Sequence, residues 1–314
     1  MHPAASVILF TTLSGTGYGL LWWICFAQLL TPHTSRPVLV AYIIAAALIS
    51  IGLMASTWHL GQPLRAWRAF SQWRTSWLSR EGVIAVFSFV PLGLLILLEW
   101  RDINVGRDFV SLGMVLCIHL TIHCTAMIYA SLRPIHAWYH WLVPVGYQVY
   151  AIIGGGMVFV VCDMMAGITQ NTIMMGLLGI LAVGWWHRHA YHLHLMHDDT
   201  QTNPKNAVNA LGLGERGITS VRKLEQPGGA NQYLCKEMGY VVARRHAQFL
   251  ARMCLVLLIF VPVCTIIMVA LGAMGFLLWG ALISAAIGLA LERWLFFARA
   301  KHRVMLYYHP VSVQ

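Results

Sequence analysis

Two residue types that exchange protons, a histidine and a glutamate, flank one polar stretch between long apolar runs. His59 follows the apolar run 38–58, and Glu81 precedes the run 82–100. If both runs form antiparallel helices, the two side chains emerge at the same depth on the same side of the molecule. Imidazole titrates near neutral pH, and a carboxyl group at the same depth can exchange protons as well. The pair therefore predicts a site for the two-electron, two-proton chemistry of a quinone.

Basic and aromatic residues of the same stretch would complete such a site. Arg65 and Arg80 would act on the pair electrostatically, and Trp77 would pack against a flat ring. The alternative is structural, with a histidine at the end of one helix and a glutamate where the helix dipole of the next favours negative charge. These residues by themselves leave both interpretations open.

The composition predicts an integral membrane protein. Of the 314 residues 59% are hydrophobic and only 10% are charged, whereas soluble domains carry about 25% charged residues. The mean hydropathy is +0.67. The net charge of +10 comes from basic residues in the short segments between apolar runs. There they indicate topology and contact with membrane lipids, and not nucleic acid.

A membrane-spanning helix needs about 20 mostly apolar residues. We expect an all-α bundle of eight transmembrane helices, forming a single membrane domain over 1–314. In the fifth helix, Gly154, Gly155 and Gly156 leave one face without side chains, which favours close helix packing. The expected spans are about 6–30, 38–58, 82–100, 109–131, 142–162, 171–191, 250–271 and 274–298.

The basic residues predict the orientation. With eight spans, eighteen of the 21 Lys and Arg residues lie on one side, and Arg36, Arg101 and Arg107 lie on the other. The positive-inside rule then places both termini and the stretch with His59 and Glu81 in the cytoplasm. The polar segment 192–248 becomes a cytoplasmic loop that covers the membrane surface or docks another protein.

His119 and His123 lie four residues apart inside the expected fourth span. Polar side chains at this depth are costly and mark functional sites, and histidine is an axial ligand of b-type haem. Haem would also need a ligand on a second helix, yet no other expected span has a histidine near its middle. Hydrogen bonding to a neighbouring helix is the favoured alternative, so we expect no metal in this chain.

Two further sets of residues leave alternatives open, and the cysteines argue against two kinds of site. Glu292, two turns inside the last span, forms an ion pair with Arg293 or relays protons to Glu81. Five histidines near the end of the sixth span form a metal site or, as we favour, an interfacial belt; they are His187, His189, His192, His194 and His197. The seven cysteines include no C-x-x-C pair, which argues against an iron–sulfur cluster or a disulfide framework in this chain.

Several stretches resemble a known family. Residues 59–66 (HLGQPLRA) and 75–81 (TSWLSRE) resemble the membrane anchor subunit of the dimethyl sulfoxide reductase family. Residues 237–246 (EMGYVVARRH) and 292–302 (ERWLFFARAKH) look like the branch that includes anchors of cytoplasmic membrane-bound sulfite dehydrogenases. The resemblance extends over essentially the whole chain, although the segment 192–248 is longer than in the best-known anchors.

The resemblance implies a heterotrimer in the bacterial inner membrane. A molybdopterin catalytic subunit and an iron–sulfur subunit would dock on the cytoplasmic face, and the anchor would exchange electrons with menaquinone or ubiquinone. The family's quinol-site histidine and glutamate correspond to His59 and Glu81. The anchor itself would not catalyse the reaction of the terminal substrate. The rival class is a secondary transporter, but the internal symmetry and broken helices typical of many transporters are not apparent in the sequence.

Overall fold

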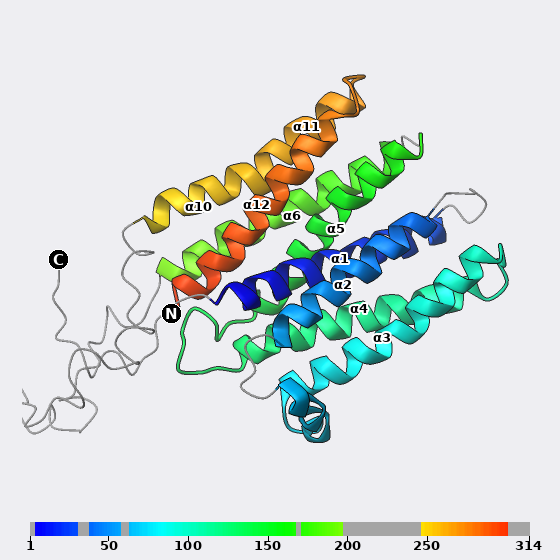
Figure 1. Cartoon of the computed structure of the whole chain (residues 1–314). Coiled ribbons are helices and arrows are strands. Elements are labelled where there is room, and N and C mark those ends of the chain that lie inside the picture. The colour runs from blue at the N-terminus through cyan, green and yellow to red at the C-terminus, as the bar shows by residue number, and fades with distance from the viewer. Residues whose placement is uncertain (1–3, 31–37, 58–62, 168–170, 197–245, 301–314) are drawn as a thin grey trace, which may run out of the picture.

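The computed structural model describes residues 4–30, 38–57, 63–167, 171–196 and 246–300. Within these ranges the regular elements are all helices (Figure 1). They are α1 (Ala5–Leu30), α2 (Leu39–Thr57), the 3-10 helix η1 (Pro63–Gln72), α3 (Trp77–Trp100), α4 (Arg107–Ala130), α5 (Leu142–Met165), α6 (Asn171–Met196), α10 (Ala247–Leu255), the π-helical η3 (Val256–Phe260), α11 (Val261–Ala270) and α12 (Leu277–Ala298).

Seven helical segments of the described chain are long and apolar enough to cross a membrane. They are α1 to α5, the continuous stretch Ala247–Ala270 formed by α10, η3 and α11, and α12. Helix α6 has 26 residues but is less apolar, because its second half carries Arg188 and several histidines. The expected all-α membrane fold is confirmed, whereas an eighth span at 171–191 stays a prediction.

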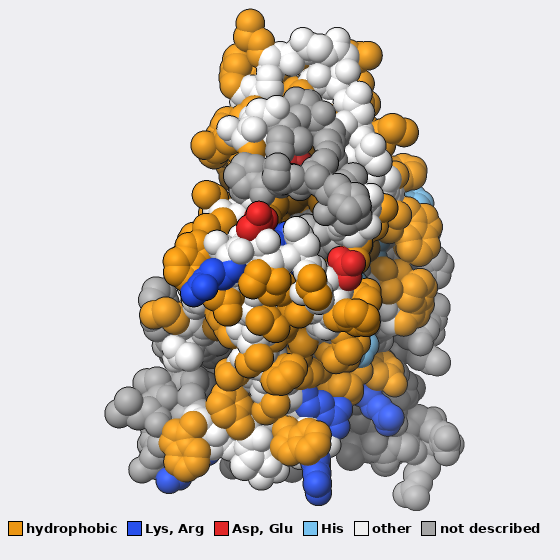
Figure 2. Space-filling model, turned by 90° about the vertical axis from the view of Figure 1, so that its right-hand side faces the viewer, with side chains coloured by type: hydrophobic (Ala, Val, Ile, Leu, Met, Phe, Trp, Pro, Cys, Tyr) orange, Lys and Arg blue, Asp and Glu red, His pale blue; other side chains and the backbone are white. Residues whose placement is uncertain are grey.

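The outer surface of the bundle is apolar, as a lipid environment requires. Large side chains such as Val90, Phe109 and Ile43 are more than half exposed. Figure 2 views the bundle mainly from the end at which α2, α4 and α12 begin, and there too hydrophobic side chains predominate and charged ones are scattered. In water such a surface would cause aggregation, so these helices are stable only where lipid covers them.

Helix α1 lies in the middle of the bundle and packs against α2, α4 and α5, while α3 pairs with α4 on one side (Figure 1). Helices α6, α10, α11 and α12 form the other side. Consecutive long helices run in opposite directions. Helices α1, α3, α5 and α10 therefore begin at the end of the bundle where α2, α4, α6 and α12 finish. We call this end, where α3 carries Glu81 in its second turn, the Glu81 end.

Helix α3 begins five residues earlier than the expected span 82–100. Ser76 is its N-cap, and the Ser76 side chain accepts a hydrogen bond from the backbone N–H of Ser79. Arg80 turns back and donates to the carbonyl oxygens of Trp73 and Arg74 at 2.9 and 2.6 Å. These polar contacts extend the helix past its apolar run. As a result Glu81 lies inside α3 and not just before it.

Helices α1 and α5 approach each other closely at two glycines. A Cβ atom on Gly155 would overlap the backbone of Gly19 and Leu20, and a Cβ atom on Gly19 would overlap the carbonyl of Ala151. The helix backbones can make this contact only because both positions lack side chains. The packing role predicted for the three consecutive glycines of α5 is thus confirmed.

Gly155→Ala should destabilise the protein, because the methyl group would force α1 and α5 apart. Overpacking of this kind costs about 1–3 kcal/mol, and the melting temperature of the detergent-solubilised protein measures the loss. The matched control is Gly179→Ala in α6, where a Cβ atom would meet nothing within 4 Å. The control should be neutral or slightly stabilising. Equal melting temperatures for the two variants would contradict the close contact.

Candidate functional site

Glu81 is a buried carboxyl group in the second turn of α3. Its exposed fraction is 4%, and the hydroxyl group of Thr125 on α4 donates a hydrogen bond to its Oε1. Among the described residues no basic side chain forms an ion pair with it. An unpaired buried carboxylate is costly, so this side chain is suited to accepting a proton when one is delivered.

The hydrogen bonds of Thr125 support this interpretation. Its Oγ1 lies 3.0 Å from the carbonyl oxygen of Thr121 as well as beside Glu81. A hydroxyl group has one proton and can donate to only one of these two acceptors at a time. A proton on Glu81 would turn both contacts into hydrogen bonds at once. Thr125 can therefore stabilise Glu81 with or without its proton.

A narrow cavity lies beside Glu81 in the interior of the bundle. Its volume is about 20 Å³, which is close to the space that one water molecule needs. Polar side chains from four other helices line it: Ser14 and Tyr18 of α1, Thr121 and Thr125 of α4, Tyr147 and Tyr150 of α5, and Arg293 of α12. Glu81 of α3 and Arg293 of α12 thus line the same small cavity.

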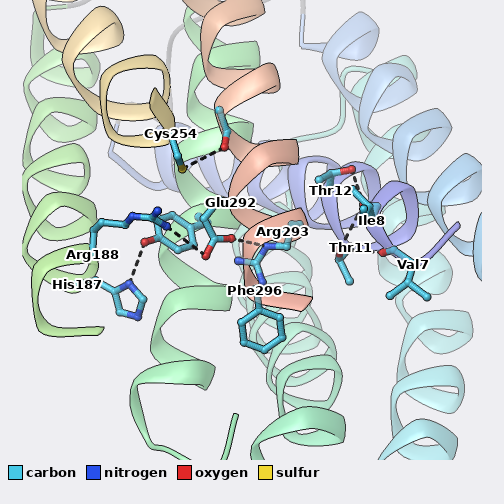
Figure 3. A network of polar contacts seen from close by, with 12 residues as sticks. Val7, Ile8, Thr11, Thr12, His187, Arg188, Cys254, Glu292, Arg293 and Phe296 are labelled. Atoms are coloured by element: carbon cyan, nitrogen blue, oxygen red, sulfur yellow. Dashed lines mark hydrogen bonds and ion pairs between the residues drawn. The ribbon is translucent and has the colours of Figure 1, made fainter. Parts of the chain in front are cut away.

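Arg293 and Glu292 form a buried ion pair on α12 at the far side of this cavity. The Nε of Arg293 lies 3.0 Å from Oε2 of Glu292, and the two residues are 3% and 4% exposed. The guanidinium group of Arg293 also lies over the ring of Tyr147, 3.9 Å from its centroid. On the opposite side Glu292 faces Arg188 of α6 at 4.0 Å (Figure 3). The structural ion pair considered for Glu292 is therefore present.

The same network continues to His187 on α6. The Nε2 of His187 lies 2.8 Å from the carbonyl oxygen of Leu142, so this nitrogen carries the proton and donates it. Its Nδ1 must then accept, and the hydroxyl group of Tyr150 donates to it at 3.0 Å. His187 is thus a buried, hydrogen-bonded link between α5 and α6.

Trp77, Arg80 and His123 lie together near the start of α3. The guanidinium group of Arg80 lies over the ring of Trp77 at 4.3 Å from the centroid. The ring of His123 on α4 meets Trp77 edge-on at 6.1 Å. Arg80 stacks on Trp77 and binds backbone carbonyls, and it forms no ion pair with Glu81. Trp77, the first residue of α3, and His123 thus lie together about one turn before the buried Glu81.

His119 makes hydrogen bonds between helices, as the alternative to haem ligation predicted. The indole N–H of Trp22 on α1 donates to its Nε2 at 3.2 Å, so the proton of the ring is on Nδ1. Nδ1 donates to Oε1 of Gln148 on α5 at 3.0 Å, and the Gln148 amide donates to the carbonyl of His119 at 2.9 Å. Both ring nitrogens are engaged, and His119 would have to leave Trp22 or Gln148 before it could bind iron.

The histidines near the end of α6 point in different directions. His189 stacks on Trp185. His194 stacks on the ring of His140 with a centroid distance of 3.8 Å, and its ring is tilted against that of His136 at 4.4 Å. The described residues contain no group of three or more ligand side chains placed to hold a metal ion. This arrangement resembles the aromatic and basic belt that we favoured.

His140, in the connection between α4 and α5, should make stability depend on pH. Burial lowers its pKa, and His194 and His136 lower it further. Its Nδ1 accepts the backbone N–H of Leu142 at 3.2 Å, a bond that protonation would break. The contribution is present above the ordinary histidine pKa of about 6.5 and is lost as the pH falls below it. The melting temperature should therefore drop between about pH 7.5 and pH 5.5.

His140→Gln should reduce this drop, because glutamine does not titrate. His189→Gln, which changes a ring stacked on Trp185, serves as the control and should keep the wild-type pH dependence. An unchanged pH profile in His140→Gln would assign the titration to other groups.

Several predicted residues lie outside what the structure describes. His59 falls in the gap 58–62, and Arg65 lies in η1 with a side chain that is not described. Of the expected loop 192–248, residues 192–196 belong to α6 and 247–248 to α10, and 197–245 are outside the described residues.

The structure adds Thr125, Tyr147 and Arg293 to the residues around Glu81, and the sequence analysis does not predict them as site residues. The sequence does contain an indication for Thr125, because Thr121 and Thr125 lie four residues apart and therefore share one face of α4.

Comparison with known proteins decides the family. The family model described as DMSO reductase anchor subunit (DmsC) matches residues 1–298. This chain belongs to the DMSO reductase anchor subunit family. A curated relative is a sulfite dehydrogenase subunit of Allochromatium vinosum, which is 31% identical over 338 aligned residues. The alignment covers 99% of this chain and 100% of that relative. No solved structure matches the chain. The resemblance expected from residues 59–66 and 75–81 is confirmed.

Proposed function

We propose that this chain is the quinone-reactive membrane anchor of a molybdopterin and iron–sulfur oxidoreductase, passing electrons between the iron–sulfur subunit and the quinone pool. The placement of Glu81 carries the proposal. It is a buried carboxyl group without a described counter-ion, in the second turn of α3. The stretch that holds His59 precedes α3 in the chain. Family membership supports the role of an anchor.

The residues near the start of α3 fit a quinone head group. The cavity behind Glu81 holds about one water molecule, so the ring would bind outside it, beside Trp77. Trp77 supplies a flat aromatic wall, and Arg80 and His123 stand next to it. A bound quinone supplies two-electron, two-proton redox chemistry. The role of Glu81 is to accept or deliver a proton, and the role of His59 is to donate a hydrogen bond to a carbonyl oxygen of the ring.

The charge distribution supports a cytoplasmic location for the Glu81 end. Most Lys and Arg residues flank this end in the eight-span topology, with both termini on the same side. An iron–sulfur subunit must lie within electron-transfer reach of the quinone, so it would dock at the Glu81 end. The name of the relative from Allochromatium vinosum favours a sulfite-oxidising complex. The sulfur chemistry would then belong to the molybdopterin subunit.

We assign Glu292 a role in supplying protons to Glu81. Glu81 and Thr125 line the same cavity as Arg293, which is the ion-pair partner of Glu292. Tyr18, Tyr147 and Thr121 offer hydroxyl groups in this cavity. A water molecule in this space would bridge donors and acceptors that lie too far apart for direct hydrogen bonds.

Copurification from the native membrane tests the proposal. The chain should bring down a molybdopterin protein and an iron–sulfur protein, and the complex should reduce or oxidise an added quinone as well as a soluble dye. A colourless protein purified alone would contradict the anchor role. An absorption band of reduced b-haem would contradict the expectation that this chain binds no metal, and would direct attention to His119 and His123.

A further inference from the structure

A second, larger cleft lies between α6, α10 and α12 at the Glu81 end of the bundle. Its volume is about 310 Å³, at the lower end of the roughly 300–1,000 Å³ typical of ligand pockets. Each of the three helices contributes one arginine, with Arg188 from α6, Arg252 from α10 and Arg299 at the end of α12. His189 and His192 add two more nitrogen-bearing rings. Three guanidinium groups thus line one space.

The positive charge in this cleft exceeds the negative charge. Glu292 is the one carboxylate among the lining residues, and it already pairs with Arg293 at 3.0 Å and faces Arg188 at 4.0 Å. Within the described part of the chain, Arg252 and Arg299 form no ion pair. Burial lowers the pKa of Arg299, and the nearby Arg188 lowers it further. An anion between these side chains would relieve their repulsion.

The surroundings of the cleft are apolar and suited to acyl chains. Trp185 lines the cleft and is about half exposed (49%), as expected of an aromatic side chain at a membrane interface. Phe249, Met253 and Val256 are exposed at helical spacing along α10 and η3, next to Arg252. Phe249 lies one turn nearer the Glu81 end than Arg252, and Met253 and Val256 follow Arg252 toward the middle of the bundle. A free inorganic anion would not contact these side chains.

We propose that the cleft binds the phosphate head group of an anionic phospholipid. Guanidinium groups bind phosphate through pairs of charge-assisted hydrogen bonds, and basic pockets between membrane helices on the cytoplasmic side suit such head groups. Arg252 and Arg299 would contact the phosphate oxygens, while Arg188 would remain shared with Glu292. The acyl chains would lie along Met253 and Val256, which follow Arg252 toward the middle of the bundle. The bound lipid would join α10 to α6 and α12.

The test measures lipid binding to the purified complex after delipidation. Phosphatidylglycerol should raise the melting temperature and be retained in native mass spectrometry, whereas phosphatidylcholine and inorganic phosphate should do neither. Arg252→Gln should weaken phosphatidylglycerol binding by about tenfold or more, because it removes a charged hydrogen-bond donor. Arg252→Gln combined with Arg299→Gln should abolish it.

The matched control is Arg101→Gln at the opposite end of the bundle, where Arg101 lies over the ring of Trp100. It should bind phosphatidylglycerol as the wild type does. Arg252 is exposed, so its single variant should fold even if the double variant does not. Equal lipid binding by wild type and Arg252→Gln would overturn the proposal. An equal effect of inorganic phosphate and phosphatidylglycerol would show a site for a soluble anion, and would overturn the lipid assignment.

Discussion

Glu81→Gln should abolish electron exchange with quinone while leaving dye-linked activity of the assembled complex unchanged. Glutamine has nearly the same shape and can still accept the hydrogen bond from Thr125, but it cannot exchange a proton at neutral pH. Loss of a general acid or base typically costs about 100- to 10,000-fold in rate. Turnover with a quinol analogue and turnover with a soluble dye, measured on the same preparation, separate the two activities.

The control for this variant is Glu99→Gln at the other end of α3. Glu99 pairs with Arg107 at 3.2 Å, far from the Glu81 end. Its replacement should leave both activities near the wild-type level. If Glu81→Gln retained quinone-linked turnover, the carboxyl group would be a structural feature of the helix start. If both activities vanished, the variant would have lost assembly. His59→Ala, a change in the stretch that precedes α3, would then be used to test quinone exchange separately from assembly.

Arg293→Met should destabilise the protein strongly. It would leave Glu292 buried, with Arg188 at 4.0 Å as its remaining described partner, and removing one partner of a buried ion pair typically costs about 3–5 kcal/mol. The stacking of the guanidinium group on Tyr147 would be lost as well. The melting temperature of the solubilised complex should therefore fall by several degrees, or the protein should fail to accumulate in the membrane.

Two companion variants identify the cause of this effect. Arg107→Met breaks the more exposed pair with Glu99, where the side chains are 16% and 15% exposed, and should cost far less. Arg293→Met combined with Glu292→Gln should recover part of the stability, because the buried carboxylate that lost its closest partner is then neutral; Arg188, which lines an open cleft, is the one cation of the described network that remains. If the double variant were no more stable than Arg293→Met, the loss would come from packing against the tyrosines and not from the charge.

Glu292→Gln by itself distinguishes a proton relay from a purely structural ion pair. Glutamine keeps the size of the side chain but leaves the buried charge of Arg293 without its carboxylate, so some loss of stability is expected and both activities are compared per assembled complex. If Glu292 relays protons, the variant should lose quinone-linked turnover and keep dye-linked turnover, because glutamine cannot release a proton. Unchanged turnover with both electron acceptors would leave Glu292 with a structural role only.

Much of the fold was determined by the sequence itself. Apolar runs of about 20 residues are membrane helices because the lipid core offers no hydrogen bonds to an unpaired backbone, and the observed helices begin and end within about five residues of the expected spans. The three glycines of α5 predicted a close helix contact, since only missing side chains permit it. The motifs at residues 59–66 and 75–81 indicate the family from the sequence alone.

The partners of the buried polar side chains were decided only by the tertiary structure. Thr125 binds Glu81 across 44 residues of sequence, and His119 reaches Trp22 across 97. Hydropathy reports how each residue interacts with lipid or water, and contains no information about which helix faces which. The same limit explains α6, whose polar half is tolerated because Arg188 and His187 find buried partners on α12 and α5. Only the packed bundle brings Glu81 of α3 and Arg293 of α12 to the same small cavity.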